Sequence, residues 1–353
     1  MRLRSALGTV AFPTVLAGRP AELMALQRQF DDSERWPPAR RAAARWAQLG
    51  QLVAHAATIP FHAARLRDAG IDPGAPLTEA AWSRLPVLTR AELPQAGGIA
   101  PTTHGEVSEA ASAGTTAPPV RVRKTALDGL FWQAALVREE RWHRARPEGL
   151  VLRLTAIPAH LPAPLAARAR GRDGLLLPNA GPPVNDIWHT GQLLLADAAR
   201  PPDSVRALLR RHRPSYLLTT PATLRALLPH LEGVPRPLAV WTIGAAVDPG
   251  LRAACEARLG APIVANYAAA ETGYMALQCP DHPHYHVLDE HCLLEVLDDA
   301  GRPAETGRVV VTPLHNFATP LLRYQIGDIA TRGPACACGR TLPVLTHIDR
   351  MTA

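Results

Sequence analysis

Apolar positions in the middle of the chain recur with helical and strand periods in alternation. In residues 203–213, three aliphatic side chains fall on one face of a helix that Asp203 precedes and Pro214 ends. The apolar run at 216–219 then predicts a buried strand. The pattern continues with helices predicted at 221–231 and 249–259 and strands at 238–243 and 262–266. This alternation predicts an α/β fold with a mostly parallel, helix-covered sheet.

The two ends of the chain have different patterns. Residues 39–69 are alanine-rich with apolar side chains at helical spacing, and Pro60 breaks the predicted helix. The sequence Thr-Arg-Ala-Glu at 89–92 is a capping box, which predicts a helix start. After Leu293, two apolar runs flank the turn residues at 298–301, and this arrangement predicts a β-hairpin. We therefore expect a small β-rich region at the C-terminal end.

Composition is that of a globular protein, with 47% hydrophobic and 20% charged residues among 353. No apolar run approaches the roughly 18–20 residues that cross a bilayer, so we expect no membrane segment and a cytoplasmic location. The net charge of +7 comes from dispersed arginines. It is compatible with an anionic partner, but no aromatic-interleaved basic motif accompanies it, and we expect no nucleic acid partner.

Two segments place an acidic residue beside aromatic and turn residues. Residues 266–273 read NYAAAETG, and residues 312–328 end in RYQIGD. A carboxylate held at a turn can accept hydrogen bonds from both hydroxyls of a ribose. A second carboxylate, Glu271, can hold a hard cation against phosphate oxygens. Together the segments predict a nucleotide site.

These segments resemble the class I adenylate-forming enzymes, specifically the branch of phenylacetate–CoA ligases and their capsule-locus relatives. The resemblance also covers residues 61–93, 112–119 and 336–343. It implies the large N-terminal domain of that superfamily, with helix-covered sheets and a distorted barrel. The implied parts are an N-terminal helical segment and first sheet at 1–110, a nucleotide-binding core at 111–290, and a β-rich subdomain at 291–353. The C-terminal lid domain, which carries a catalytic lysine in the family, is expected to be absent.

The resemblance also implies roles for individual residues. Ser112 and Gly114 would contact the phosphates of ATP, while Thr115, Thr116 and Glu271 would be catalytic, with Glu271 on Mg²⁺. The sequence departs from the family at three positions. Ala117 and Pro118 stand where a glycine and often a lysine occur, and Ala270 stands where a serine or threonine contacts the α-phosphate. These departures predict slow or altered chemistry, since one lost transition-state donor costs about 10²–10³ in rate.

The nucleoside would be held by a further set of residues. By resemblance, Tyr267 stacks on adenine and Asp328 binds the ribose. The same site would also include Gly244, Ala245, Asn266 and Arg323. The simpler reading of Asp328 is a turn-capping residue after glycine.

Cysteines and histidines give a separate signal. Cys336 and Cys338 form a tight pair, and Cys279 lies upstream near three histidines. Thiolate and imidazole ligands suit a structural, tetrahedral Zn²⁺. The resemblance favours His286 as the fourth ligand, with His282 as the alternative. Free thiols in a reducing compartment are the competing interpretation.

Two functions are compatible with these features. The first is ATP-dependent activation of a small carboxylic acid as acyl-AMP, followed by transfer to CoA, a carrier thiol or an amine. A carrier protein or a separate lid-domain protein would then be a partner. The alternative is a catalytically weakened homologue that acts as a nucleotide-binding or scaffold subunit in a biosynthetic pathway. The sequence does not identify the acid, the acceptor or the oligomeric state.

Overall fold

A computed structural model describes residues 3–10, 12–96, 104–111 and 120–351. The chain forms two compact units. Unit 1 comprises Met1–Glu22 and Glu140–Asn266, and unit 2 comprises Leu23–Glu139 and Tyr267–Ala353. The three domains expected at 1–110, 111–290 and 291–353 remain a prediction. Each unit is described by itself below.

Unit 1 is built on a mostly parallel sheet with the strand order β4-β5-β3-β6-β7-β8. Its strands are β3 (Val151–Thr155), β4 (Leu175–Leu177), β5 (Leu193–Asp197), β6 (Tyr216–Thr219), β7 (Ala239–Thr242) and β8 (Ile263–Ala269). The pairs formed by β3, β5, β6, β7 and β8 are parallel, and only the edge strand β4 is antiparallel to its neighbour. The predicted parallel sheet is therefore confirmed. The last three residues of β8 belong to unit 2.

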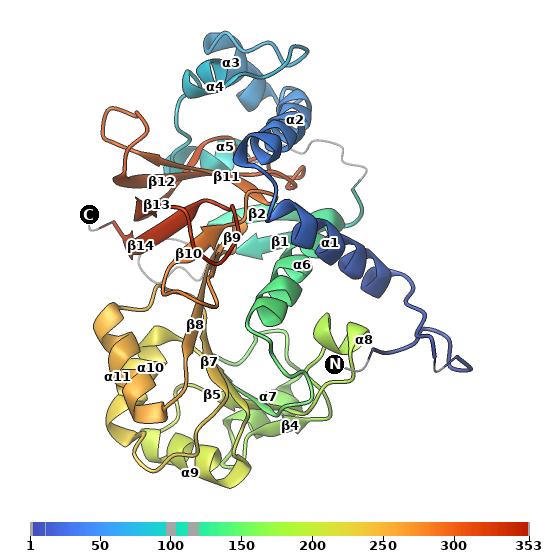
Figure 1. Cartoon of the computed structure of the whole chain (residues 1–353), viewed down its shortest axis with the longest axis vertical. Helices are drawn as coiled ribbons and strands as arrows, with labels where there is room; N and C mark the ends of the chain where they lie inside the picture. Colours follow the sequence, from blue (N-terminus) through green and yellow to red (C-terminus); the bar gives the residue numbers. More distant parts are fainter. Residues whose placement is uncertain (1–2, 11, 97–103, 112–119, 352–353) are drawn as a thin grey trace. The chain divides into compact units, whose positions relative to one another are not determined.

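Helices accompany this sheet in the predicted alternation. They are α7 (Ala163–Arg170), α8 (Val184–Ile187), α9 (Pro202–His212), α10 (Pro221–Leu227) and α11 (Pro249–Leu259), with the 3-10 turn η2 (Leu228–His230). Figure 1 shows α9, α10 and α11 beside the strands of unit 1. The buried stripe of α9 is Val205, Leu208 and Leu209, as the periodicity predicts. Arg213 ends α9 in a left-handed conformation, with φ of 46°, before Pro214.

Unit 2 is built on an antiparallel sheet with the strand order β11-β12-β13-β14-β10-β9. Its strands are β9 (Gly273–Gln278), β10 (Tyr285–Val287), β11 (Cys292–Leu297), β12 (Thr306–Pro313), β13 (Tyr324–Gly333) and β14 (Val344–Arg350). Strands β11 and β12 pair along their length, so the predicted hairpin is confirmed. A second, two-stranded sheet pairs β1 (Val107–Ala111) with β2 (Arg121–Thr125).

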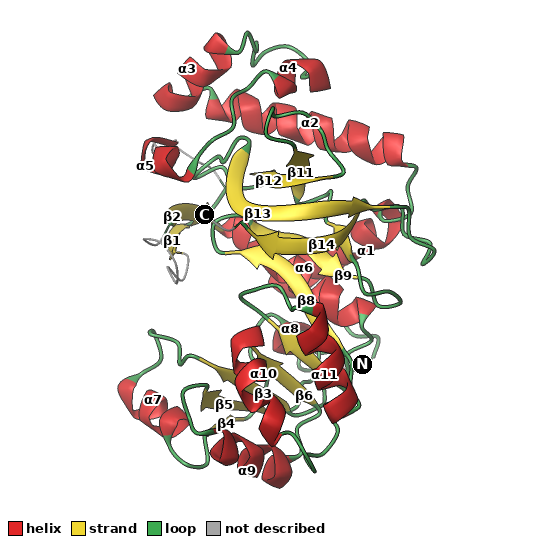
Figure 2. Ribbon diagram, turned by 90° about the vertical axis from the view of Figure 1, so that its left-hand side faces the viewer, coloured by secondary structure: helices red, strands yellow, loops and turns green. Residues whose placement is uncertain are grey.

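Helices of unit 2 cover part of its sheet. They are α2 (Pro38–Ala56), α3 (Pro60–Asp68), α4 (Glu79–Ser83), α5 (Leu93–Ala96) and the 3-10 turn η1 (Arg90–Glu92). Helices α1 (Arg19–Ser33) and α6 (Ala126–Trp142) also lie mostly in this unit. Leu49 and Leu52 of α2 and Trp82 of α4 share one apolar core with Leu293 of β11. Figure 2 shows α2, α3 and α4 grouped beside β11 and β12. Full burial of each leucine contributes about 1.5–3 kcal/mol.

The start and end signals of the N-terminal helices follow local chemistry. Pro60 separates α2 from α3, as predicted. The backbone N–H of Thr89 donates to the Glu92 carboxylate at 2.8 Å, which confirms the capping box. In the part of the chain that the structure describes, no helix combines the length and the apolar character needed to cross a membrane.

Candidate functional site

Tyr267 and Asp328 meet in unit 2 although 61 positions separate them in sequence. The Tyr267 hydroxyl donates to Asp328 Oδ2 at 2.7 Å, and Arg350 Nη1 donates to Oδ1 at 3.2 Å. Asp328 lies on β13 opposite Arg350 on β14, so the strand register sets the second contact. Burial raises the pKa of Asp328, and the bonds from Tyr267 and Arg350 only partly oppose this effect. The result is a buried carboxylate held between a phenol and a cation.

Glu271 supplies a second buried carboxylate. It lies in the turn between β8 and β9 and is 5% exposed. Its Oε2 is buried and has no hydrogen-bond partner within the described residues. An unpartnered buried carboxylate oxygen is costly unless a donor or a cation joins it. This oxygen is therefore a candidate ligand atom for a hard cation.

Tyr324 is affected by the charges of both carboxylates. It lies on β13 four residues before Asp328, on the same buried side of the strand. Burial raises the pKa of its hydroxyl, and the charges of Glu271 and Asp328 raise it further. Both carboxylates therefore lie near this hydroxyl, which itself has no partner among the residues described. Tyr267 and Asp328 are thus in contact, and the charges of Glu271 and Asp328, in the same unit, both act on Tyr324.

Arg323 occupies a different environment from the nucleoside contact that the resemblance implies. Its guanidinium forms an ion pair with Glu295, with Nη2 to Oε1 at 2.9 Å. It also donates to the backbone oxygens of Ser83 and Leu85, at 2.8 and 2.6 Å. These contacts support a structural role, in which Arg323 ties β13 to the end of α4.

Of the remaining residues expected at the nucleotide site, some fall outside the described residues and the others belong to unit 1. Ser112, Gly114, Thr115 and Thr116 fall outside the described residues. Gly244 and Ala245 follow β7 in unit 1, and both are exposed. Gly244 has a φ of 89° with open space where a side chain would begin, so the left-handed backbone rather than crowding requires glycine. Asn266 is the last residue of unit 1, half-buried on β8.

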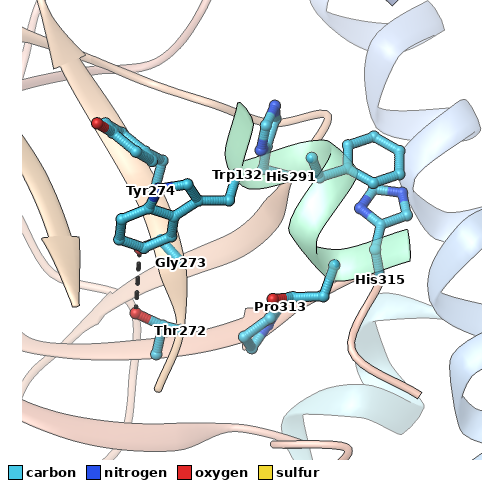
Figure 3. Close-up of a pocket in the computed structure, with 9 residues that line it drawn as sticks. Trp132, Thr272, Gly273, Tyr274, His291, Pro313 and His315 are labelled. Atoms are coloured by element: carbon cyan, nitrogen blue, oxygen red, sulfur yellow. Dashed lines mark hydrogen bonds between the residues drawn. The ribbon is translucent and has the colours of Figure 1, made fainter. Parts of the chain in front are cut away.

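A pocket in unit 2 begins directly after Glu271. Thr272, Gly273 and Tyr274 form one wall, and Asp128, Phe131 and Trp132 of α6, with His291, Pro313 and His315, form the rest. Figure 3 shows the rings of Trp132 and Tyr274 side by side, and their centroids are 4.9 Å apart. Lys124 pairs with Asp128 at 2.8 Å. Thr272, Gly273, Pro313 and His315 belong to the two segments that the sequence singled out. The pocket residues of α6 and His291 were not identified from the sequence, because they match no motif.

Two histidines of this pocket are held neutral. Burial lowers the pKa of His291 to about 4, and burial lowers that of His315 to about 3. The His315 ring stacks on Phe131, with centroids 3.5 Å apart and planes 7° from parallel. His291 Nε2 is buried and has no hydrogen-bond partner in the described part of the chain. The pocket therefore combines aromatic walls with one buried imidazole nitrogen that has no partner within the described residues.

An ionic cluster includes Glu290, the residue before His291. Arg138 of α6 lies between Glu34 and Glu290, with contacts of 3.1 and 3.3 Å, and its side chain is 1% exposed. Burial opposes the ionisation of Glu290, but the Arg138 charge and the Ser33 hydroxyl hold its pKa below the usual value. Because every charge is paired, the cluster can be buried without a large penalty.

The predicted metal ligands Cys279, His286, Cys336 and Cys338 converge in unit 2, with their donor atoms within 4.8 Å of one another. Cys279 Sγ lies 3.9 Å from Cys336 Sγ, and Cys338 Sγ lies 3.4 Å from His286 Nε2. Two sulfurs on one tetrahedral Zn²⁺ with bonds of about 2.3 Å would be about 3.8 Å apart. The donor set therefore fits a structural zinc ion. Burial raises the pKa of Cys279 to about 12, which a bound cation would offset.

The alternative ligand, His282, is also close. Its Nδ1 lies 3.6 Å from Cys279 Sγ and 3.3 Å from Cys336 Sγ. His282 and His284 form a second ligand group with Cys279 and Cys336. The sequence left His282 as an alternative to His286, and the structure brings both histidines to the cluster.

No protein-family model matches the chain. A segment is 43% identical over 75 residues to the phenylacetate–coenzyme A ligase of Thermus thermophilus, and the match covers 19% of this chain and 17% of that protein. The chain thus matches less than a fifth of this curated relative.

Solved structures match nearly the whole chain. A 2-hydroxyisobutyryl-CoA ligase bound to R3-HIB-AMP in its postadenylation state has a TM-score of 0.70 at 18% identity, covering 99% of this chain and 75% of that one. The same ligase bound to 2-HIB-AMP and CoA in its thioesterification state has a TM-score of 0.67 at 19% identity, covering 99% and 76%. At this identity the likeness concerns the fold.

Proposed function

We propose, from the premise that this chain has the fold of the adenylate-forming ligases, that it uses ATP to activate a small carboxylic acid as acyl-AMP. A carboxylate oxygen of the acid would attack the α-phosphorus of ATP, and the bond from that phosphorus to the leaving pyrophosphate would break. The observation that carries this proposal is the convergence of Tyr267, Glu271 and Asp328 around Tyr324 in unit 2.

Asp328 would bind the ribose. Its carboxylate already accepts bonds from Tyr267 and Arg350, yet burial still raises its pKa, so further donors would be favourable. Two ribose hydroxyls are such donors. Tyr267 would offer its ring to adenine, a contact worth roughly 1–3 kcal/mol by analogy with other base-stacking sites. Tyr267 therefore has two roles, since its hydroxyl also orients Asp328.

Glu271 would hold Mg²⁺ against the phosphate oxygens. The buried, unpartnered Oε2 supports this role, because a magnesium ion commonly takes one or two carboxylate ligands together with substrate phosphates. The ion would neutralise phosphate charge. Phosphoryl chemistry of this kind depends on positioning and charge stabilisation, so the chain's own contribution is the placement of these groups.

The acid would enter the pocket beside Thr272 and Gly273. This position follows from the chain, because the pocket wall continues directly from Glu271. Trp132, Tyr274 and Phe131 favour an apolar body, and His291 Nε2 favours one hydrogen-bonding group on it. We therefore propose a small acid that carries a hydroxyl or amino group. The acyl group would then pass to the thiol of CoA or of a carrier, or to an amine, as the bond from the acyl carbon to the phosphate oxygen breaks and AMP leaves.

A second function is favoured by Ala270. Its methyl group stands where the resemblance expects a hydroxyl donor to the α-phosphate, a loss that would slow adenylation. A homologue weakened in this way could serve as a nucleotide-binding or scaffold subunit.

ATP–pyrophosphate exchange tests the leading proposal. Two pairs of acids, with and without a hydroxyl group, would separate the preference for an apolar body from the preference for a hydrogen-bonding group. The pairs are 2-hydroxyisobutyrate against pivalate, and 4-hydroxyphenylacetate against phenylacetate. We expect exchange with the hydroxylated member of at least one pair, and discrimination of about tenfold or more. His291→Phe should reduce that discrimination while retaining exchange.

Calorimetry with AMP separates the two functions. AMP binding without exchange for any acid would leave only the scaffold function. Absence of both AMP binding and exchange would overturn both proposals. The exposed Glu305→Gln substitution is the matched control for Glu271→Gln, since it removes a carboxylate charge away from the site.

A further inference from the structure

Six donor side chains gather at the Cys/His cluster, more than one tetrahedral ion can use. They are the thiols of Cys279, Cys336 and Cys338 and the imidazoles of His282, His284 and His286. A structural zinc ion takes four ligands. Two imidazoles therefore remain after a single ion has bound the four residues predicted from the sequence.

The six side chains divide into two ligand groups that share two cysteines. Cys279 and Cys336 belong to both groups. Cys338 and His286 complete one of them, and His282 and His284 complete the other. Within each group, all donor atoms lie within 4.8 Å of one another.

The second group has geometry of its own that suits a metal. Cys279 Sγ, Cys336 Sγ and His282 Nδ1 form a triangle with sides of 3.9, 3.6 and 3.3 Å. Ligands on one tetrahedral ion with bonds of about 2.0–2.3 Å lie at about these separations. His284 Nε2 is buried and has no hydrogen-bond partner within the described ranges. Its ring is parallel to that of His282, with 3° between the planes.

We propose that this cluster binds two zinc-class divalent ions bridged by the thiolates of Cys279 and Cys336. One ion is completed by Cys338 and His286, and the other by His282 and His284. The second ion gives a partner to His284 Nε2, a buried atom that an ion held by Cys279, His286, Cys336 and Cys338 leaves without one. The inference is independent of the proposed ligase activity.

Charge also favours the second ion. Three thiolates around one divalent ion leave a net negative charge in a partly buried site, whereas two ions leave a net positive charge of one unit. Each bridging thiolate then faces two cations. Structurally, the pair of ions joins the loop after β9 to the loop between β13 and β14.

Metal content of the full chain tests the proposal directly. The protein is stripped with a chelator under reducing conditions, reloaded with zinc, desalted and measured by mass spectrometry for zinc per chain. We expect two ions in the wild type, one in the His282→Ala/His284→Ala double variant, and none in Cys279→Ser/Cys336→Ser. His347→Ala, which removes an exposed histidine of β14, is the matched control and should retain two.

Cobalt titration distinguishes a bridged pair from two separate sites. The first equivalent of Co²⁺ should develop thiolate-to-cobalt absorption and a high-spin paramagnetic signal. The second should diminish that signal, because two cobalt ions sharing thiolates couple antiferromagnetically. In His282→Ala/His284→Ala, the second equivalent should change neither spectrum. Circular dichroism of each variant establishes that it is folded.

Three results would overturn the inference. One zinc ion per wild-type chain, unchanged in the double histidine variant, would mean that His282 only donates a hydrogen bond to the thiolates of a single ion. Two zinc ions with an undiminished cobalt signal would exclude thiolate bridging. If the chain retains no zinc, the cluster is not a metal site, and this result leaves the proposed ligase function unaffected.

Discussion

Removing the Tyr267 hydroxyl should destabilise unit 2 by a predictable amount. This hydroxyl donates to Asp328 Oδ2 at 2.7 Å, and the two residues are 9% and 8% exposed. A hydrogen bond to a charged group contributes about 1.5–3 kcal/mol, and water has little access to replace it. The bond from Arg350 contributes only about 0–1 kcal/mol, because its side chain is 63% exposed. We therefore expect Tyr267→Phe to lower the free energy of unfolding by about 1.5–3 kcal/mol at pH 7.

A double-mutant cycle isolates this bond. The free energy of unfolding would be measured by urea denaturation for the wild type, Tyr267→Phe, Asp328→Ala and the double variant. We expect a coupling energy of about 1.5–3 kcal/mol. Tyr324→Phe is the matched control, because its buried hydroxyl has no partner among the described residues, and its removal should not destabilise. A coupling energy below about 0.5 kcal/mol would refute the reasoning, since additive effects indicate no interaction.

The pH dependence has a definite sign. The Tyr267 bond favours the ionised form of Asp328 and so lowers its pKa, although burial keeps that pKa above 3.8. The contribution of the bond is therefore present above the folded-state pKa of Asp328 and decreases as pH falls through it. The difference between wild type and Tyr267→Phe should shrink toward acid. The raised pKa of Asp328 has the opposite effect on the pH dependence of stability. Protonated Asp328 contributes stability below pH 3.8, and this contribution is lost as pH rises through the folded-state pKa.

Three further predictions concern other groups. Glu271→Gln should lower the rate of pyrophosphate exchange about 10²-fold or more. It should leave the urea midpoint unchanged or higher, since Oε2 has no partner within the described residues. An exchange rate equal to that of the wild type would contradict the proposed role of Glu271. Arg138→Met should cost about 3–5 kcal/mol of unfolding free energy because it removes the cation that pairs with the largely buried Glu290 carboxylate, whereas the exposed Arg28→Ala should change it by less than about 1 kcal/mol; similar midpoints for both variants would refute this. Burial lowers the pKa of His62 and of His291 to about 4, so the stability that each neutral ring contributes is present above pH 6.5 and lost as pH falls toward 4. Each histidine should account for a loss of up to about 2 kcal/mol in the free energy of unfolding between pH 7 and 5. If the slope of that free energy against pH is unchanged in His291→Phe, His291 is excluded as a source.

Sequence patterns determined the elements and much of the fold. The stripe of α9, the Pro60 break and the Thr89 capping box depend on neighbours within one or two turns, so the sequence contains the necessary information. The α/β fold class is confirmed by the observed sheets and by the solved structures that the chain matches. The resemblance to the adenylate-forming enzymes is confirmed by those structures and by the 43% identical segment.

The sequence identified residues of the candidate site, but it did not identify the groups that each of them contacts. The motifs singled out Tyr267 and Asp328, yet the bond between them depends on how β8 and β13 lie in the folded sheet. Arg323 matched the same motif, and its ion pair with Glu295 could not be read from a segment that lacks Glu295. The roles of these residues in binding a nucleotide stay predictions.

Tertiary structure alone decided the pocket and the composition of the metal cluster. Phe131, His291 and His315 come from separate elements, and only packing brings them to the turn after Glu271. The resemblance ranked His286 above His282, whereas the fold brings both to shared cysteines. The physical reason is the same in each case. Periodicity and capping are properties of adjacent residues, but the distance between groups tens of positions apart is fixed by the burial and strand pairing of the whole unit.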